Sequence, residues 1–245
     1  MDEMIEKSYD GYKLYIYKDK SELSLNVSNF IENQIFKILK IKDRFQFCVS
    51  GGSTPKSVYQ LLSERDIEWN KVDIFLGDER CVDPKSELSN SLMLKNSLLS
   101  KYGSKAFFYK IFTDKKVDDN ISKNLLISKM SEKCNGQPPS FDLTLLGLGD
   151  DGHTASLFPY QKDNNADDLV IFSEGKGLKR ISLTPKVLSA SSKIIFLVSG
   201  ASKQLALKRL LDKDESQERT PSKLIKSINQ ISIFCDEESS KELSI

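Results

Sequence analysis

Residues 45–62 read FQFCVSGGSTPKSVYQLL, and this stretch decides the fold class. The apolar residues at 45–49 predict a short strand, and the two glycines after it predict a sharp turn. Pro55 suits the first position of a helix with Thr54 as its cap, and an apolar stripe continues that helix to residue 62. A strand, a tight turn and a helix in this order form the repeating unit of a parallel α/β sheet.

The rest of the chain repeats this alternation. Apolar runs and helical periodicity predict strands at 72–76, 141–146, 181–183, 193–198 and 231–235 and helices at 21–40, 91–99, 117–130 and 202–211. This pattern predicts a single α/β domain over residues 1–245, with a mostly parallel sheet flanked by helices on both faces. Ligands bind such sheets beyond the carboxyl ends of the strands, so the polar segments after the strands are the candidate site.

The composition excludes several classes of protein. The 36 Lys and Arg residues balance 35 Asp and Glu residues, and a net charge of +1 argues against adaptation to nucleic acid or an anionic membrane. The longest apolar run, at 194–198, is too short to span a bilayer, and the acidic start of the chain shows no secretory signal. Four scattered cysteines fit a reduced, cytoplasmic protein, and one histidine excludes a multi-histidine metal site.

The turn at 50–55 predicts a binding site for an anion. Gly51 and Gly52 let the backbone approach a ligand closely, and Ser53 and Thr54 supply hydroxyl donors. The helix that follows begins with free N–H groups and a partial positive charge. The spacing and the lysine of a P-loop are absent, and an ordinary capped turn is the alternative interpretation.

Three cations stand near the ends of other predicted strands. Arg80 follows the strand 72–76 in a chain with only six arginines, and its planar guanidinium matches phosphate or carboxylate oxygens, although a solvated loop is the alternative. Lys203 falls in the first turn of a helix, where a cation is unfavourable unless an anion is bound there. Arg180 precedes a short apolar segment, and this position alone does not indicate a role for it.

A glycine pattern typical of dinucleotide-binding proteins, G-x-G-x-x-G, occurs at 147–152, and Asp167 lies twenty residues beyond its first glycine. Two features argue against a dinucleotide. Pro159 interrupts the segment where the phosphate-binding helix should continue, and Asp150 and Asp151 place negative charge where a pyrophosphate would lie. We therefore reject the nicotinamide interpretation.

His153 is the only histidine, the residue type that ordinarily titrates near neutral pH. Asp151 lies two residues before it, and Asp78 can approach from the neighbouring strand end. A carboxylate beside an imidazole fixes its tautomer and raises its basicity, as a general base requires. A structural histidine is the alternative, but the glycines and acids at a strand end favour catalysis.

Together these segments resemble the 6-phosphogluconolactonase family, within a larger group that includes the glucosamine-6-phosphate deaminases/isomerases. The matching stretches occur in the family's order: residues 50–55, 77–80, 89–90, 147–159, 180–185, Gly200 with Lys203, and 221–222. The most specific block is GLGDDGHTASLFP at 147–159. The deaminases carry a functional glutamate after the matching histidine, whereas SLFP supplies no carboxylate here, so the lactonase branch is favoured.

The resemblance implies a modified Rossmann-like fold of the sugar-phosphate isomerase type. It also implies hydrolysis of 6-phospho-D-glucono-1,5-lactone to 6-phosphogluconate in the oxidative pentose phosphate pathway. We expect a phosphorylated sugar lactone as the partner, no metal, no cofactor, no nucleic acid and no membrane, and a monomer or small homo-oligomer. A glucosamine-6-phosphate deaminase/isomerase and a non-catalytic sugar-phosphate sensor are the alternatives.

The expected site has a catalytic part and a binding part. His153, oriented by Asp151, is expected to activate a water for attack on the lactone carbonyl, with Asp78 beside the sugar hydroxyls. The expected substrate- and phosphate-binding residues are Gly51, Gly52, Ser53, Thr54, Arg80, Asn90, Arg180 and Lys203.

Overall fold

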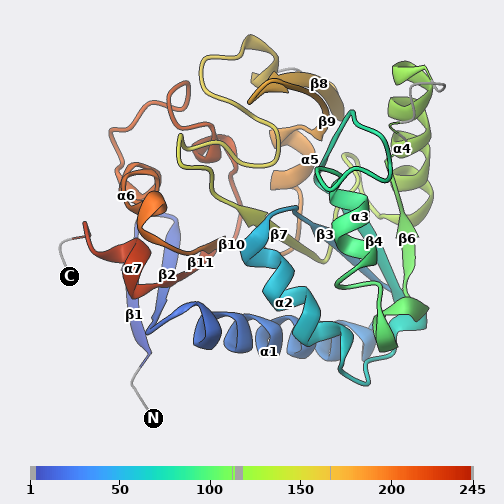
Figure 1. Ribbon diagram of the computed structural model, residues 1–245, viewed down its shortest axis with the longest axis horizontal. Helices are drawn as coiled ribbons and strands as arrows, with labels where there is room; N and C mark the ends of the chain where they lie inside the picture. The colour runs from blue at the N-terminus through green and yellow to red at the C-terminus, as the bar shows by residue number, and fades with distance from the viewer. Residues whose placement is uncertain (1–3, 112, 114–117, 166, 244–245) are drawn as a thin grey trace.

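Eight strands form the main sheet of the structure, a computed structural model that describes residues 4–111, 113, 118–165 and 167–243. They are β1 (Ile5–Tyr9), β2 (Tyr12–Tyr17), β3 (Phe45–Val49), β4 (Val72–Leu76), β6 (Phe107–Tyr109), β7 (Leu143–Gly147), β10 (Ile194–Val198) and β11 (Ile231–Asp236). Their order is β1-β2-β11-β10-β7-β3-β4-β6, and all pairs are parallel except the β1–β2 hairpin (Figure 1). The predicted mostly parallel sheet is confirmed.

The central strands are buried along their whole length. Every residue of β3, β4 and β10 is buried, as expected for parallel strands that helices cover on both faces. The strands align so that Val49 pairs with Leu76 and Leu197 with Gly147, which brings the carboxyl ends of β3, β4, β7 and β10 to one edge of the sheet.

The helices are α1 (Lys20–Leu39), α2 (Ser53–Ser63), α3 (Asn90–Lys95), α4 (Asp119–Lys133), α5 (Pro185–Ser189), α6 (Gln204–Leu211) and α7 (Glu237–Ser240). Short 3-10 turns add η1 (Trp69–Lys71), η2 (Lys101–Lys105), η3 (Lys162–Asn165), η4 (Ala201–Lys203) and η5 (Pro221–Leu224). No described helix combines the length and the apolar character needed to cross a membrane.

The order in which strands join the sheet determines where the helices lie. From β2 through β3 and β4 to β6 the chain moves across the sheet in one direction, and from β6 through β7 and β10 to β11 it moves back. Right-handed crossovers therefore place α1, α2 and α3 on one face and α4, α5 and α6 on the other. The direction changes between the neighbours β3 and β7, which creates a crevice at their carboxyl ends.

A second, three-stranded antiparallel sheet covers this edge. It consists of β5 (Asp78–Arg80), β9 (Leu178–Leu183) and β8 (Val170–Gly175), in the order β5-β9-β8. Only one residue, Gly77, separates β5 from the end of β4, so the chain passes directly from one sheet to the other. The polar segment 77–80, for which a solvated loop was the alternative interpretation, is therefore largely a strand.

Several predicted boundaries are corrected by the structure. Helix α2 begins at Ser53 with Gly52 as its N-cap, not at Pro55 with Thr54 as cap, because the positive φ of Gly52 (112°) starts the helix earlier. The helix predicted at 91–99 is α3, which ends at Lys95. The helix predicted at 117–130 is α4, and residue 117 lies outside the described residues. The sequence analysis also did not predict β1, β2, β6 and β8, of which β1 is largely exposed and β6 has only three residues.

Candidate active site

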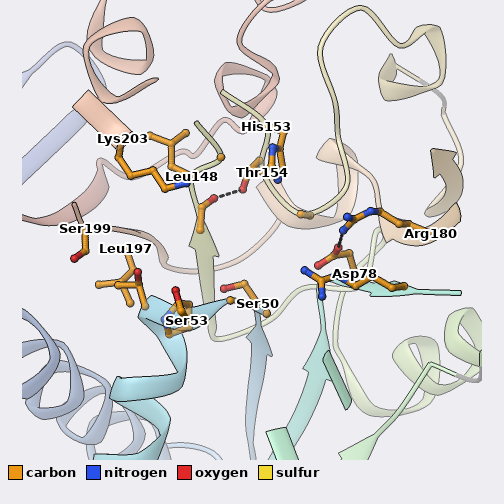
Figure 2. Close-up of a pocket in the computed structure, with 18 residues that line it drawn as sticks. Ser50, Ser53, Asp78, Leu148, His153, Thr154, Arg180, Leu197, Ser199 and Lys203 are labelled. Carbon is orange, nitrogen blue, oxygen red and sulfur yellow. Dashed lines mark hydrogen bonds and ion pairs between the residues drawn. The ribbon is translucent and has the colours of Figure 1, made fainter. Parts of the chain in front are cut away.

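A pocket opens at the carboxyl ends of β3 and β7, at the switch point of the sheet (Figure 2). Its cavity of about 200 Å³ is lined by the loops after β3, β7 and β10 and by residues of β5 and β9. The predicted site residues in its wall are Gly51, Gly52, Ser53, Thr54, Asp78, Arg80, His153, Arg180 and Lys203. The two other predicted residues, Asp151 and Asn90, lie behind this wall and contact residues that form it.

The turn after β3 is shaped for close approach of a ligand. A Cβ at Gly51 would lie 2.0 Å from Oδ1 of Asn90, so a larger residue would displace the asparagine. Ser50 is held by Tyr59, whose hydroxyl accepts from the Ser50 N–H (3.2 Å) and donates to the Ser50 carbonyl (2.9 Å). The start of α2 therefore lies at the pocket on a fixed turn, where its free N–H groups favour an anion.

Two arginines face each other across the second sheet. Arg80 of β5 is the register partner of Arg180 of β9, although like charges at opposed positions repel. Arg80 donates to the Leu88 carbonyl (2.6 Å), and its Nε is buried with no partner in the described part of the chain. Arg180 is 6% exposed, and this burial lowers the pKa of its guanidinium despite the nearby Asp78 carboxylate, 3.7 Å away. An anion bound between the arginines would relieve the repulsion.

Asp78, a pocket residue, is held by its neighbours. Its Oδ2 accepts from the Ser156 hydroxyl (2.5 Å), its Oδ1 accepts from Nδ2 of Asn90 (3.3 Å), and its backbone carbonyl accepts from the same amide (2.9 Å). Asp78 is 4% exposed. Asn90 therefore supports the aspartate from behind the pocket wall.

Glu79, whose role the sequence analysis missed, ties the next loop to β5. Its buried carboxylate accepts from the backbone N–H groups of Asn90 (2.8 Å) and Ser91 (2.7 Å) and from the hydroxyl of Ser89 (3.2 Å). The signal was present in the sequence, because three consecutive charges after an apolar strand need partners when they are buried.

His153 and Asp151 form a close pair. The ring Nδ1 lies 2.5 Å from Oδ1 of Asp151, and the same oxygen accepts from the His153 backbone N–H at 3.0 Å. A carboxylate only accepts, so Nδ1 carries a proton, and in the neutral ring Nε2 keeps its lone pair for a bound molecule. Burial raises the pKa of Asp151, but the hydrogen bonds and charge of His153 outweigh this effect and hold that pKa well below its usual range.

Gly149 makes room for this pair. A Cβ at Gly149 would lie 2.0 Å from Nδ1 of His153 and 2.7 Å from Oδ1 of Asp151. The described residues between β7 and η3 contain no helix, so the dinucleotide pattern at 147–152 folds into a turn that serves the histidine. The rejection of a dinucleotide is consistent with this geometry.

The third cation of the wall, Lys203, ends η4 beside the same loop (Figure 2). Within the described residues it makes neither an ion pair nor a hydrogen bond, and burial lowers its pKa, although Asp150 partly opposes this shift. The neighbouring carboxylate of Asp150 is paired instead with Lys176 of the β8–β9 turn (2.7 Å). Apart from His153, the charged side chains placed in the wall are thus three cations and one carboxylate, Asp78.

One group of side chains has the spacing of metal ligands. Atoms of Asp150, Asp151 and His153 lie within 4.8 Å of one another. However, Asp150 pairs with Lys176, and Oδ1 of Asp151 bonds the histidine itself. The chemistry of the group therefore fits an oriented base better than a cation site.

The chain is similar to a known family and to several curated proteins. Residues 18–233 match the family model described as glucosamine-6-phosphate isomerases/6-phosphogluconolactonase. A 6-phosphogluconolactonase from Nostoc sp. is 30% identical over 236 residues, which cover 94% of this chain and 98% of the relative. Another from Thermotoga maritima is 33% identical over 186 residues, covering 74% and 81% of the two chains.

Solved structures agree with this similarity. The crystal structure of the 6-phosphogluconolactonase from Thermotoga maritima superposes with a TM-score of 0.80 at 28% identity, covering 91% of this chain and 99% of the other. The 6-phosphogluconolactonase from Trypanosoma brucei superposes with a TM-score of 0.84 over 97% and 100% of the two chains. At 23% identity, this second likeness supports the fold alone.

Proposed function

The chain belongs to the family of glucosamine-6-phosphate isomerases and 6-phosphogluconolactonases, and we propose that it works with His153 as a general base and a cationic pocket as the phosphate site. Its reaction is the hydrolysis of 6-phospho-D-glucono-1,5-lactone to 6-phosphogluconate, a step of the oxidative pentose phosphate pathway.

The phosphate group of the substrate is the part that the cationic pocket binds. It carries about −1.5 to −2 charges at neutral pH. Arg80, Arg180 and Lys203 offer guanidinium and ammonium donors, and the N-terminus of α2 offers N–H groups and the hydroxyls of Ser53 and Thr54. Holding the phosphate at these groups positions the lactone carbonyl beside the imidazole, which converts binding energy into orientation.

The chemical step needs one base. Nε2 of His153 takes a proton from a water, and the resulting hydroxide adds to the lactone carbonyl to give a tetrahedral oxyanion. The oxyanion collapses, the bond to the ring oxygen breaks, and the imidazolium returns its proton to that oxygen. Asp151, which accepts from Nδ1–H, stabilises the imidazolium between the two transfers. Asp78, held by Ser156 and Asn90, presents a fixed carboxylate to the sugar hydroxyls.

A deaminase requires more acid–base groups than this pocket offers. Aldose–ketose isomerisation and amine loss need proton transfers at several atoms, whereas the described pocket wall holds one imidazole and one carboxylate. The segment after the histidine, residues 156–159, contains no carboxylate, and its first residue, Ser156, is buried and donates to Asp78. These observations favour hydrolysis of the lactone.

One observation carries the proposal: the carboxylate-oriented His153 shares a pocket with three cations, Arg80, Arg180 and Lys203, against a single carboxylate of the described wall, Asp78, which lies 3.7 Å from Arg180. The test is a coupled assay on freshly generated 6-phosphoglucono-1,5-lactone, in which 6-phosphogluconate formation is followed and spontaneous hydrolysis is subtracted. We expect an added rate that is proportional to protein concentration. Binding of 6-phosphogluconate without added hydrolysis would indicate a sensor, and release of ammonia from glucosamine 6-phosphate would indicate a deaminase.

We extend the proposal to the setting of the reaction. The whole chain, residues 1–245, acts as one domain, since the family model covers residues 18–233. It works in the cytoplasm as a monomer or small homo-oligomer, without metal, cofactor, nucleic acid or membrane. The balanced charge and the four scattered cysteines support this setting.

A further inference from the structure

The ring of Phe158 lies against the ring of His153. Their centroids are 4.6 Å apart, and the ring planes are tilted by 35°. Phe158 is 5% exposed, and Nδ2 of the buried Asn164 donates to its carbonyl at 2.7 Å, so both the ring and the backbone are fixed. Phe158 is not part of the pocket wall. It therefore contacts the proposed base from outside the pocket wall.

The same ring also contacts a cation of the pocket. The guanidinium carbon of Arg180 lies 5.2 Å from the centroid of Phe158, a distance at which the ring attracts a cation. Arg180 further donates through Nε to the carbonyl of Gly175 (3.3 Å). The side chain of Phe158 thus contacts two groups of the proposed site. One is the base His153, on the loop after β7, and the other is Arg180 of β9, which is proposed to bind the phosphate.

Gly175, at the end of β8, leaves the space that the ring occupies. A Cβ at this position would lie 2.2–2.5 Å from three ring carbons of Phe158. No positive φ is found at Gly175, so glycine is required here for space and not for backbone conformation. A methyl group at position 175 would therefore push the ring out of place while leaving Phe158, His153 and Arg180 unchanged.

We propose that Phe158 is a positioning residue that holds the imidazole of His153 in its reactive orientation and links that orientation to the anion bound at Arg180. The inference rests on the proposed function of His153 and Arg180. Phe158 prevents the imidazole from tilting, because the ring is close-packed and cannot move while Arg180 and Gly175 hold it. An anion bound at Arg180 holds the guanidinium against the ring, and the ring in turn holds the imidazole.

The kinetic test uses two perturbations of the same ring. F158L removes the ring, and G175A displaces it. Each is expected to lower kcat about tenfold or more while KM changes less, since misplacement of a catalytic group by about 1 Å can cost 100-fold. In the F158L background, G175A should lower kcat by less than about twofold, because the smaller side chain leaves room for the methyl group.

A matched control lies on β8, the strand that also contains Gly175. Phe172 of β8 has Nζ of Lys179 5.2 Å from its ring centroid, but it contributes nothing to the pocket wall. F172L should keep the kcat of the unaltered protein. The proposal is overturned if F158L and G175A leave kcat unchanged, if their effects simply multiply in the double variant, or if F172L lowers kcat equally.

A second readout needs no turnover. Because the chain has one histidine, its imidazole NMR signals are unambiguous. Inorganic phosphate, which has no sugar to touch the imidazole, should shift these signals in the unaltered protein and in F172L, and by less than half as much in F158L. An equal shift in F158L would overturn the link. Failure of the proposed function would instead appear as an unaltered protein without lactonase activity, whatever the NMR result.

Discussion

Buried charges are fully paired at one end of the main sheet and incompletely paired at the other. At the amino ends of the strands, Asp73 of β4 is fully buried and is met by Arg44 through two bonds, Nε to Oδ2 (2.7 Å) and a terminal nitrogen to Oδ1 (2.6 Å). At the carboxyl ends, Arg180 is buried but stands 3.7 Å from Asp78 and opposite a second arginine.

The contrast extends to the neighbours of each pair. At the amino ends, Tyr109 (3.1 Å) and Gln46 (3.4 Å) also donate to Asp73, and Lys42 donates to both oxygens of Asp142 (2.7 and 2.9 Å). The hydrogen bond to Asp73 raises the pKa of Arg44, whereas burial lowers the pKa of Arg180. Removing one partner of a fully hydrogen-bonded buried ion pair destabilises a fold, whereas the incompletely paired Arg180 is suited to an external anion.

The largest effect is expected at the carboxyl ends, in activity alone. H153N removes the proposed base and should lower kcat/KM by about 10²–10⁴-fold, the usual contribution of positioned proton transfer. Its melting temperature should stay close to that of the unaltered protein. The coupled lactonase assay with the spontaneous rate subtracted measures the first quantity, and thermal unfolding measures the second. Full activity in H153N would remove His153 from the mechanism.

The next effect is expected at the amino ends, in stability alone. R44M leaves the buried Asp73 without its cation and should lower the free energy of unfolding by about 3 kcal/mol. Urea denaturation measures this change. The kcat/KM of the folded variant should be unchanged, because Arg44 lies at the opposite edge of the sheet from the pocket. A loss of less than about 1 kcal/mol would contradict the structural role assigned to this pair.

The matched substitution at the carboxyl ends, R180M, should weaken substrate binding and leave stability nearly unchanged. R180M removes a charged donor from the phosphate and should raise KM for the phosphorylated lactone about thirtyfold, equivalent to about 2 kcal/mol of binding. Its free energy of unfolding should stay within about 1 kcal/mol of the unaltered value, because Asp78 keeps its hydrogen bonds to Ser156 and Asn90 and the repulsion between Arg80 and Arg180 is removed. The comparison substrate is the unphosphorylated gluconolactone. An equal rise in KM for both lactones would argue against a phosphate contact.

The smallest expected effect is the contribution of Lys203 to the pH dependence of stability. Folding lowers the pKa of Lys203 from its ordinary 10.5, mainly through burial, so the folded state disfavours the charged form. The resulting penalty is present below the folded pKa and is relieved as the pH rises toward 10.5. K203M should therefore be slightly more stable than the unaltered protein at pH 7, by less than about 1 kcal/mol, and this advantage should shrink near pH 10. Urea denaturation at both pH values measures the difference, and an advantage that grows with pH would contradict the sign.

Local sequence determined the fold class and the centre of the site. The apolar runs at β3, β4, β7, β10 and β11 and the glycine turn at residues 50–52 act through steric and hydrophobic effects within a few residues. The pairing of His153 with Asp151 is also local, because a turn joins positions two residues apart. The resemblance to a family rested on the same short segments.

Only the tertiary structure decided which distant charges meet. Arg80 and Arg180 face each other because β5 pairs with β9, and no periodicity in the sequence specifies that register. The same holds for Asn90 against Gly51, Phe158 against Gly175 and Arg44 against Asp73. These contacts join elements far apart in the chain, so they depend on how the complete sheet positions each strand end. Backbone sterics act between neighbouring residues and can be recognised in sequence, whereas the pairing of buried charges is set by the packed fold.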